Sequence, residues 1–373
     1  MKIDRRNLIS LIIGFAFAIT SPILLSLAQK KSSTPTRKRN LPFFLGWYDV
    51  MDNINVSTQV YSRGIDLLMP YVGNAEKETI QAFLDASEKV GVKVLLEIYR
   101  PLVESKDISG VKDFVRTYKK HPSVYGWYLY DEPELKKPKP LSLKNVYQAI
   151  KEEDKSKPIA LAISQVDHME SYTDAMDVLM WDNYPFDNGV PEFQWAQSYR
   201  STLNYIFSLN HLKNKKFWNI LQAYGENQLN KRLPTKAEFR YMFYLSVLAG
   251  ADGLLFWMHP WSSYSWNQSV LYPTIKEFRN YIPAIVRGED LSNPVQVNRS
   301  DIEVKLFPIP NTKKFVMIAV NHNQTQINFT VKLSQRLAGK AVAMNNKTIT
   351  NLSTQASFNV ILSPYEVRLY QIQ

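Results

Sequence analysis

Two adjacent carboxylates, Asp131 and Glu132, end an apolar and aromatic run in the stretch H-P-S-V-Y-G-W-Y-L-Y-D-E-P-E-L, residues 121–135. Residues 124–130 have the length and side-chain types of a buried strand. Pro133 has no backbone N–H and restricts the residue before it, so the strand should end at about Glu132. Catalytic groups of parallel α/β enzymes lie at the carboxyl ends of buried strands. The alternative is that these acids cap a following helix.

The strands and helices that would position this pair are predicted to alternate regularly along the chain. Eight short apolar runs recur, at residues 43–48, 65–71, 92–99, 124–130, 159–163, 178–181, 217–221 and 253–258. Segments with apolar residues three and four apart lie between several of them, most clearly at 75–90, 143–153 and 236–249. Strands alternating with helices predict parallel pairing, and eight such units fit an α/β fold of the (β/α)8 TIM barrel type over residues 41–292. A doubly wound open sheet is the alternative, but no G-x-G-x-x-G or Walker-type loop follows any of these runs.

The character of the chain changes after a last predicted barrel helix at residues 274–289. Short alternating runs follow between residues 302 and 372, separated by turns rich in Pro, Asn and Thr. This pattern predicts a small C-terminal antiparallel β-sandwich domain, residues 293–373. We expect it to be a structural cap on the barrel rather than a separate carbohydrate-binding module.

Composition and charge exclude several classes of protein. The 373 residues include 45% hydrophobic and 13% aromatic side chains, enough for the core of a barrel and an accessory domain. There is no cysteine, which excludes disulfides, thiolate catalysis and zinc-finger-type sites. Most of the net charge of +11 lies in residues 1–40, so residues 41–373 carry a net charge of only +4. Because no basic stripe with interleaved aromatic residues occurs, we expect no nucleic-acid partner.

The N-terminus has the pattern of an export segment. Residues 1–7 carry three positive charges, and residues 8–28 are almost wholly apolar. Residues 1–28 are therefore predicted to be a signal peptide or a signal anchor, followed by a basic polar linker at 29–40. The folded part is expected outside the cytoplasm, either secreted, periplasmic or held at the membrane through residues 8–28.

The ends of the predicted strands collect aromatic rings, acids and amides. The side chains expected around the barrel mouth are Trp47, Asp49, Tyr71, Arg100, Asp131, Glu132, Asp182, Tyr184, Gln222, Glu226, Trp257, His259 and Trp261. Such a mixture suits sugars, whose C–H faces stack on aromatic rings and whose hydroxyls need donors and acceptors. Glycosidic cleavage needs two carboxyl groups, one of them protonated. Burial beside aromatic rings and the charge of Asp131 should raise the pKa of Glu132, which is the predicted acid.

At this point the sequence resembles a known family. The segment H-P-x-V-x-G-W-Y-L-x-D-E-P, residues 121–133, is similar to strand four of TIM-barrel glycoside hydrolases of the retaining clan A type. Residues 177–185, 218–225 and 249–257 extend the resemblance across the barrel. The resemblance implies that Glu132 is the general acid/base, that Trp257 stacks on a sugar, and that Tyr184 lies near the nucleophile.

Two positions depart from the pattern of that clan. Asp131 stands where the clan usually has Asn, and Gln222 stands where it has its nucleophilic Glu. An amide cannot form the glycosyl-enzyme ester. Glu226 is the nearest replacement and Asp182 is another; Asp182 acting as a base would make inversion possible.

The sequence therefore predicts an exported glycoside hydrolase that cleaves an extracellular or envelope poly- or oligosaccharide. Glu132, Glu226 and Asp182 are the candidate catalytic residues, and the other strand-end residues named above are candidate sugar contacts. The alternative, motivated by Gln222, is a barrel that binds glycans or assists polysaccharide assembly without hydrolysis. No cofactor is expected, and five histidines without an H-E-x-x-H motif indicate no metal site. The absence of a G-x-S-x-G elbow disfavours an esterase of the α/β-hydrolase type.

Overall fold

A computed structural model describes residues 42–51, 55–136, 138–225, 229–258, 262–287, 295–299, 301–333, 340–344, 349–351 and 356–373. The predicted signal segment, 1–28, and the predicted linker, 29–40, lie outside these ranges. Within the ranges, no helix combines the length and the apolar composition needed to cross a membrane.

Each of the eight apolar runs contains a strand of a closed parallel barrel, which confirms the predicted TIM barrel. In the described part of the chain the eight strands pair in sequence order, and the first pairs with the last. They are β1 (Phe44–Val50), β2 (Leu67–Tyr71), β3 (Lys93–Glu97), β4 (Val124–Asp131), β5 (Ile159–Ile163), β6 (Val178–Asn183), β7 (Lys216–Gln222) and β8 (Gly253–Trp257). Their carboxyl ends meet at one mouth because parallel strands share a direction.

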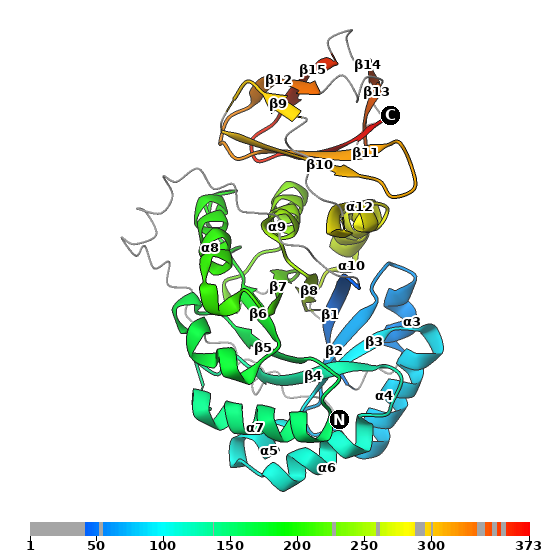
Figure 1. Ribbon diagram of the computed structural model, residues 1–373, viewed down its shortest axis with the longest axis vertical. Helices are drawn as coiled ribbons and strands as arrows, with labels where there is room; N and C mark the ends of the chain where they lie inside the picture. Colours follow the sequence, from blue (N-terminus) through cyan, green and yellow to red (C-terminus); the bar gives the residue numbers. More distant parts are fainter. Residues whose placement is uncertain are drawn as a thin grey trace.

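Helices surround the barrel, as Figure 1 shows. They are α3 (Val56–Tyr61), α4 (Lys77–Val90), α5 (Arg100–Ser105), α6 (Ile108–Tyr118), α7 (Pro140–Glu153), the 3₁₀ helix η1 (Val166–Ala175), α8 (Ala196–Ser208), the 3₁₀ helix η2 (Asn210–Leu212), α9 (Lys236–Ala249), α10 (Tyr264–Trp266), the π-helical turn η5 (Asn267–Leu271), α11 (Tyr272–Arg279) and α12 (Ile282–Arg287).

Local signals set the ends of these helices. Helix α9 begins with a capping box between Thr235 and Glu238 and ends at Gly250, which has a φ of 115°. The helix predicted at 274–289 is instead split into α11 and α12. Pro283 explains the split, because it lacks the N–H that a continuous helix requires but fits the first turn of a new one.

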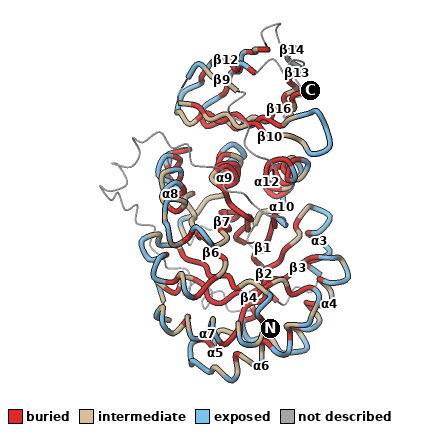
Figure 2. Tube along the Cα trace, viewed as in Figure 1, coloured by how far each residue is buried: buried red, intermediate tan, exposed pale blue. Residues whose placement is uncertain are grey.

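Alternating strand residues divide between two apolar layers. One set fills the barrel interior and includes Tyr48, Met69, Tyr128, Trp218 and Trp257. The other set packs outward against the helices. Figure 2 shows the barrel strands largely buried, whereas the surrounding helices and loops carry many exposed residues. Side-chain direction along each strand therefore decides which residues can reach the barrel mouth.

The C-terminal strands form two antiparallel sheets, as predicted. One sheet has the order β10 (Ile302–Pro308), β11 (Phe315–Asn321), β16 (Val367–Ile372), β13 (Lys340–Ala343), β14 (Ile349–Asn351). The other has the order β15 (Ser357–Leu362), β12 (Ile327–Leu333), β9 (Val295–Val297). Apolar side chains from both sheets form the core between them. The short strands β9 and β14 were not predicted.

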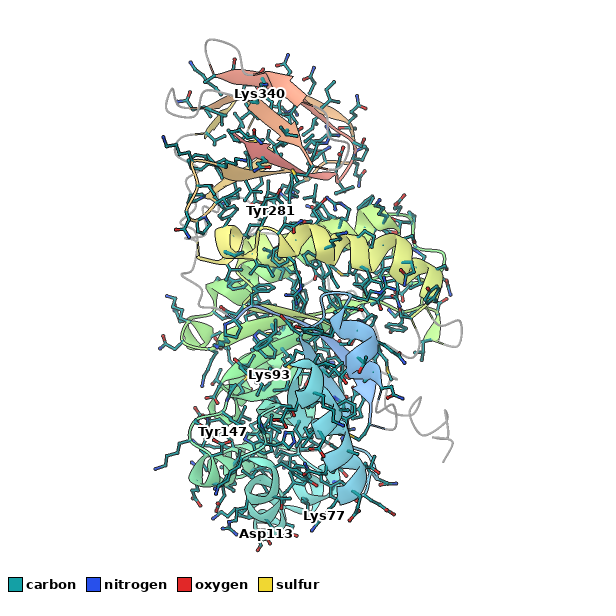
Figure 3. All side chains as sticks on the ribbon, turned by 90° about the vertical axis from the view of Figure 1, so that its right-hand side faces the viewer. Lys77, Lys93, Asp113, Tyr147, Tyr281 and Lys340 are labelled. Atoms are coloured by element: carbon teal, nitrogen blue, oxygen red, sulfur yellow. The ribbon has the colours of Figure 1, made fainter. Side chains whose placement is uncertain are left out.

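The outer face of the larger sheet packs on the barrel helices. Its apolar residues belong to the same cluster as the barrel–helix core, and the sheet lies over α9 and α12 (Figure 1). The Tyr365 ring stacks on Phe193 with centroids 4.4 Å apart and packs edge-on against Tyr241. Tyr281 lies between the two parts (Figure 3), where its hydroxyl contacts the Met344 sulfur at 3.3 Å. The interface is therefore a continuous apolar seam.

Truncation of Tyr365 tests this seam. We expect Tyr365→Ala to lower the free energy of unfolding by roughly 3 kcal/mol, because it removes a buried ring and two aromatic contacts. Urea denaturation measures the change. Tyr264→Ala is the control, since the Tyr264 side chain is 76% exposed and its loss should cost less than about 0.5 kcal/mol. Equal effects of the two variants would contradict a tightly packed interface.

Candidate active site

A bulge-like irregularity in β4 aims Asp131 into the barrel. The pairing of β4 with β5 shifts register between Tyr128 and Tyr130. Tyr128 faces the barrel interior, whereas Tyr130 faces outward and donates a hydrogen bond of 2.7 Å to Glu104. Asp131 then returns to the inside, where its Oδ1 accepts a 2.9 Å hydrogen bond from the Tyr128 hydroxyl. Such irregularities often re-aim side chains next to functional sites.

Glu132 follows directly, in an uncommon backbone conformation. Its φ is 48°, in the left-handed region that residues with a Cβ rarely occupy. Its N–H donates to the carbonyl of Ala162 on β5 at 3.1 Å, so the strand ends where Pro133 predicts.

Glu132 is an acid of the cluster with a raised pKa. Burial, followed by the charge of Asp131, raises the pKa of Glu132 to about 8, against the opposing charge of Lys136. The Lys136 Nζ lies 4.0 Å from Glu132 Oε2. Only 16% of the Glu132 side chain is exposed. The direction of this pKa shift is the one expected from the sequence, and the carboxyl is mostly protonated at neutral pH.

Asp131 is the ionised partner. Burial pushes the pKa of Asp131 upward, but the charges of Lys136 and Arg100 and the hydrogen bonds from Tyr128 and Lys136 hold it below its ordinary value. Lys136 Nζ lies 3.1 Å from Asp131 Oδ2 and 3.0 Å from its backbone oxygen. Asp131 is therefore a fixed negative charge beside Glu132.

Asp182, at the end of β6, is the second acid with a raised pKa. Burial and the charges of Glu132 and Asp131 raise the pKa of Asp182 well above its ordinary value. Its Oδ1 is buried and accepts no hydrogen bond from any described residue. The Tyr184 hydroxyl lowers this pKa slightly but lacks hydrogen-bond geometry. A buried carboxyl oxygen left unsatisfied is costly, so this one marks a place for a ligand.

Tyrosine hydroxyls around the acids are also unsatisfied. Tyr48, Tyr71 and Tyr184 each bury a hydroxyl that has no hydrogen-bond partner of acceptable geometry among the described residues. The Tyr48 ring packs against Tyr71 and Trp257 with centroids 5.8 and 5.1 Å apart. Tyr184 stacks on Trp257 at 6.1 Å. We call Tyr48, Tyr71, Tyr184 and Trp257 the aromatic cage.

Arg100 joins the rim through a fourth acid, Glu97, which is buried. Glu97 of β3 accepts hydrogen bonds from the Val72 N–H at 2.7 Å and from Arg100 Nη2 at 3.0 Å. The guanidinium also lies over the rings of Tyr71 and Tyr130, 5.9 and 5.3 Å from their centroids. Arg100 is thus held at the edge of the aromatic cage by Glu97.

The prediction that Trp47 stacks on a sugar is wrong. Its side chain is fully buried in the layer between strands and helices, packed edge-on against Phe256. Tyr48 takes the inward position instead, because neighbouring strand residues point to opposite faces.

The prediction that Gln222 contacts substrate is also wrong, because its amide is used inside the protein. Gln222 Oε1 accepts from the Phe186 N–H at 2.9 Å, and Nε2 donates to the backbone oxygens of Phe186, Tyr224 and Arg232. The side chain has no exposed surface. Gln222 holds the loops after β6 and β7 together.

Other predicted residues lie beyond what the structure describes. Glu226, His259 and Trp261 fall outside the described residues, and Asp49 is described only as backbone within β1. The sequence interpretation gave no role to Tyr48, Lys136 or Glu97, although strand alternation and the spacing of Lys136 from Glu132 were available signals.

One group of described residues has a geometry that a metal ion could use. Asp85, Glu88 and His121 lie together on the barrel surface, with His121 Nε2 3.0 Å from Asp85 Oδ1. Both acids are exposed, and the contact is an ordinary surface pair between α4 and the loop before β4.

Two substitutions in the candidate site are expected to change the free energy of unfolding. Gln222→Glu should not create a nucleophile, because it removes the donor bonds to three backbone oxygens and buries a charge. We expect it to lower the free energy of unfolding by about 2–4 kcal/mol, measured by urea denaturation. The control, Gln197→Glu on the exposed start of α8, should change it by less than about 0.5 kcal/mol. Wild-type stability in Gln222→Glu would contradict the hydrogen-bonding role.

Glu132→Gln should change the pH dependence of stability. The folded protein holds the Glu132 proton up to a pKa of about 8 against an ordinary 4.5, so this group's contribution to stability falls as pH rises through that window. Relative to wild type, Glu132→Gln should gain roughly 4 kcal/mol between pH 5 and pH 9. Thermal unfolding at both pH values measures the gain. Glu132→Asp keeps a titrating carboxyl and should show a smaller gain; a pH-independent difference for Glu132→Gln would contradict the buried acid.

Comparison with known proteins gives structural relatives only. No protein-family model matches the chain, and no curated protein matches it. A GH30 endoxylanase from Clostridium papyrosolvens C71 has a TM-score of 0.56 at 13% identity, covering 91% of this chain and 98% of that one. A GH27 β-L-arabinopyranosidase from Geobacillus stearothermophilus has a TM-score of 0.59 at 13% identity, with 89% and 97% covered. An α-amylase from Geobacillus thermoleovorans has a TM-score of 0.56 at 9% identity, with 87% and 92% covered. At such identities the likeness shows the fold alone: this chain shares with these three proteins the architecture described above.

Proposed function

We propose that the protein is a glycoside hydrolase in which Glu132 is the general acid. The observation that carries the proposal is the juxtaposition of two buried carboxyl groups of raised pKa, Glu132 and Asp182, beside the unsatisfied hydroxyls of the aromatic cage. A sugar offers both the hydroxyls that these groups lack and the apolar ring face that Trp257 and Tyr184 accept. The fold shared with known glycosidases supports the same conclusion.

The chemistry divides between the two acids. Glu132, protonated at neutral pH, donates its proton to the glycosidic oxygen as the bond from that oxygen to the sugar breaks. The charge of Glu132 raises the pKa of Asp182, so loss of a proton from Glu132 disfavours loss of the proton on Asp182. The singly protonated pair supplies an acid and a carboxylate together. Because the resemblance assigns the acid to Glu132, we take Asp182 as the second carboxylate, which stabilises the cationic sugar and either attacks it or activates a water.

The substrate is proposed to be a poly- or oligosaccharide outside the cytoplasm. This part rests on the apolar segment at residues 8–28 and its basic flanks, which are typical of exported or membrane-anchored proteins.

A second candidate function is glycan binding or polysaccharide assembly without hydrolysis. The specific observation in its favour is Gln222, an engaged amide at the strand-seven position where clan A glycosidases carry their nucleophile.

Turnover by acid variants distinguishes the two functions. Against a panel of polysaccharides and aryl glycosides, Glu132→Gln and Asp182→Asn should each lose roughly 100- to 10,000-fold in kcat/KM, while calorimetric affinity for the hydrolysed glycan stays within a fewfold. Because Glu132 must be protonated, wild-type kcat/KM should fall as pH rises through about 8.

The control is Asp113→Asn, since the Asp113 side chain is 68% exposed on α6, at the end of the molecule opposite the C-terminal domain (Figure 3). Undiminished turnover in Glu132→Gln would remove Glu132 from the mechanism. Binding without wild-type turnover on any glycan would establish the second candidate function.

A further inference from the structure

A cavity of about 770 Å³ lies between α5 and the start of α7, and Arg100, at the edge of the aromatic cage, is part of its lining. These helices lie on the side of the barrel away from the C-terminal domain (Figure 1). The volume is within the range of about 300–1,000 Å³ that small-ligand sites occupy. We call this cavity the α5–α7 groove.

The groove shares cations with the surroundings of the candidate active site. Arg100, Tyr130 and Lys136 line it. Arg100 is bound to Glu97 at 3.0 Å, and Lys136 is bound to Asp131 at 3.1 Å and lies 4.0 Å from Glu132. A chain of sugars with one glycosidic bond at Glu132 would therefore place a neighbouring unit in the α5–α7 groove.

The groove is strongly basic, although residues 41–373 as a whole carry a net charge of only +4. Among the described residues that line it are four cations, Arg100, Lys106, Lys136 and Lys139, and one carboxylate, Glu104. That carboxylate already accepts the Tyr130 hydroxyl at 2.7 Å. Lys106 and Lys139 are exposed and form no ion pair with any described residue. The positive charge here thus exceeds what the neighbouring protein groups neutralise.

Further donors complete the lining. Ser142 and Asn145 of α7 line the same groove, and α7 begins at Pro140, so the positive end of a 14-residue helix opens there. Leu141 is 69% exposed and offers an apolar surface within the groove. Cations, hydroxyl and amide donors, and an apolar face together match a sugar that carries an anionic substituent.

We propose that the α5–α7 groove is a subsite for an acidic sugar, so that the substrate is an anionic glycan whose charged unit lies next to the bond at Glu132. The inference rests on the proposed function for the placement of that bond. The anionic group is a uronate carboxylate or a sulfate ester, which share the chemistry that lysine and arginine recognise.

Matched pairs of glycans test the subsite. The probes are oligosaccharides of several polyuronides, each paired with its carboxyl-reduced form, and sulfated oligosaccharides paired with their desulfated forms. Calorimetry on the full chain carrying Glu132→Gln gives the ratio of acidic to neutral affinity for each pair. We expect a preference for the acidic member in at least one pair, and a smaller preference at high salt. The pair that shows it identifies carboxylate or sulfate.

The double variant Lys106→Ala/Lys139→Ala locates the preference. It should lower the acidic-to-neutral ratio about tenfold, whereas Lys77→Ala/Lys89→Ala, which removes the same charge from exposed positions on α4, should leave the ratio unchanged. No preference in any pair, or a preference that survives Lys106→Ala/Lys139→Ala, overturns the subsite. If the protein prefers acidic glycans but the wild type hydrolyses none, the subsite is supported and the glycosidase function is rejected. If the wild type hydrolyses neutral glycans alone, the glycosidase function is supported and the acidic subsite is rejected.

Discussion

Asp131, Glu132 and Asp182 place their carboxyl groups in a barrel interior that is mainly aromatic and aliphatic, and burying a charge there is costly. Arg100 forms an ion pair with Glu97. Asp131 stays ionised because it contacts Lys136, lies near the charge of Arg100 and accepts a hydrogen bond from Tyr128. No comparable compensation reaches Glu132 or Asp182 among the described residues, so the pKa of each is raised. The difference between the ionised Asp131 and its two neighbours thus follows from the placement of Lys136, Arg100 and the Tyr128 hydroxyl.

The side chains around these acids are arranged to bind a ligand rather than to stabilise the folded protein. Unpartnered hydroxyls on Tyr48, Tyr71 and Tyr184 and the free Oδ1 of Asp182 would be better satisfied by water or by a hydroxyl-rich molecule. Aromatic rings around them keep the effective dielectric low, which strengthens every polar contact that a ligand makes. The same arrangement that raises the pKa of Glu132 therefore also prepares the site for sugar hydroxyls.

The C-terminal domain is connected to the site through packed groups. Tyr365 stacks on Phe193, whose N–H donates to the buried Glu238 at 3.2 Å. Glu238 binds Arg232 through two hydrogen bonds of 2.7 and 2.8 Å, and the Arg232 backbone oxygen accepts from Gln222. These contacts hold the loops after β6 and β7 against α9, the helix on which the C-terminal sheet rests. The cap is thus part of the scaffold that positions the barrel mouth.

The sequence by itself determined the barrel, the C-terminal β-sandwich and the place of Glu132, because apolar periodicity and Pro133 act through neighbouring residues. It also determined that Glu132 would have a raised pKa, since the adjacent Asp131 and the aromatic run lie in the same segment. Only the tertiary structure decided that Tyr48 rather than Trp47 faces inward, since both residues are aromatic and strand alternation permits either register. It also decided that Gln222 binds backbone groups, because its partners lie up to 36 residues away in the chain. The pairing of Asp182 with Glu132 depends in the same way on closure of the barrel, which brings the ends of β4 and β6 together across 50 residues of sequence.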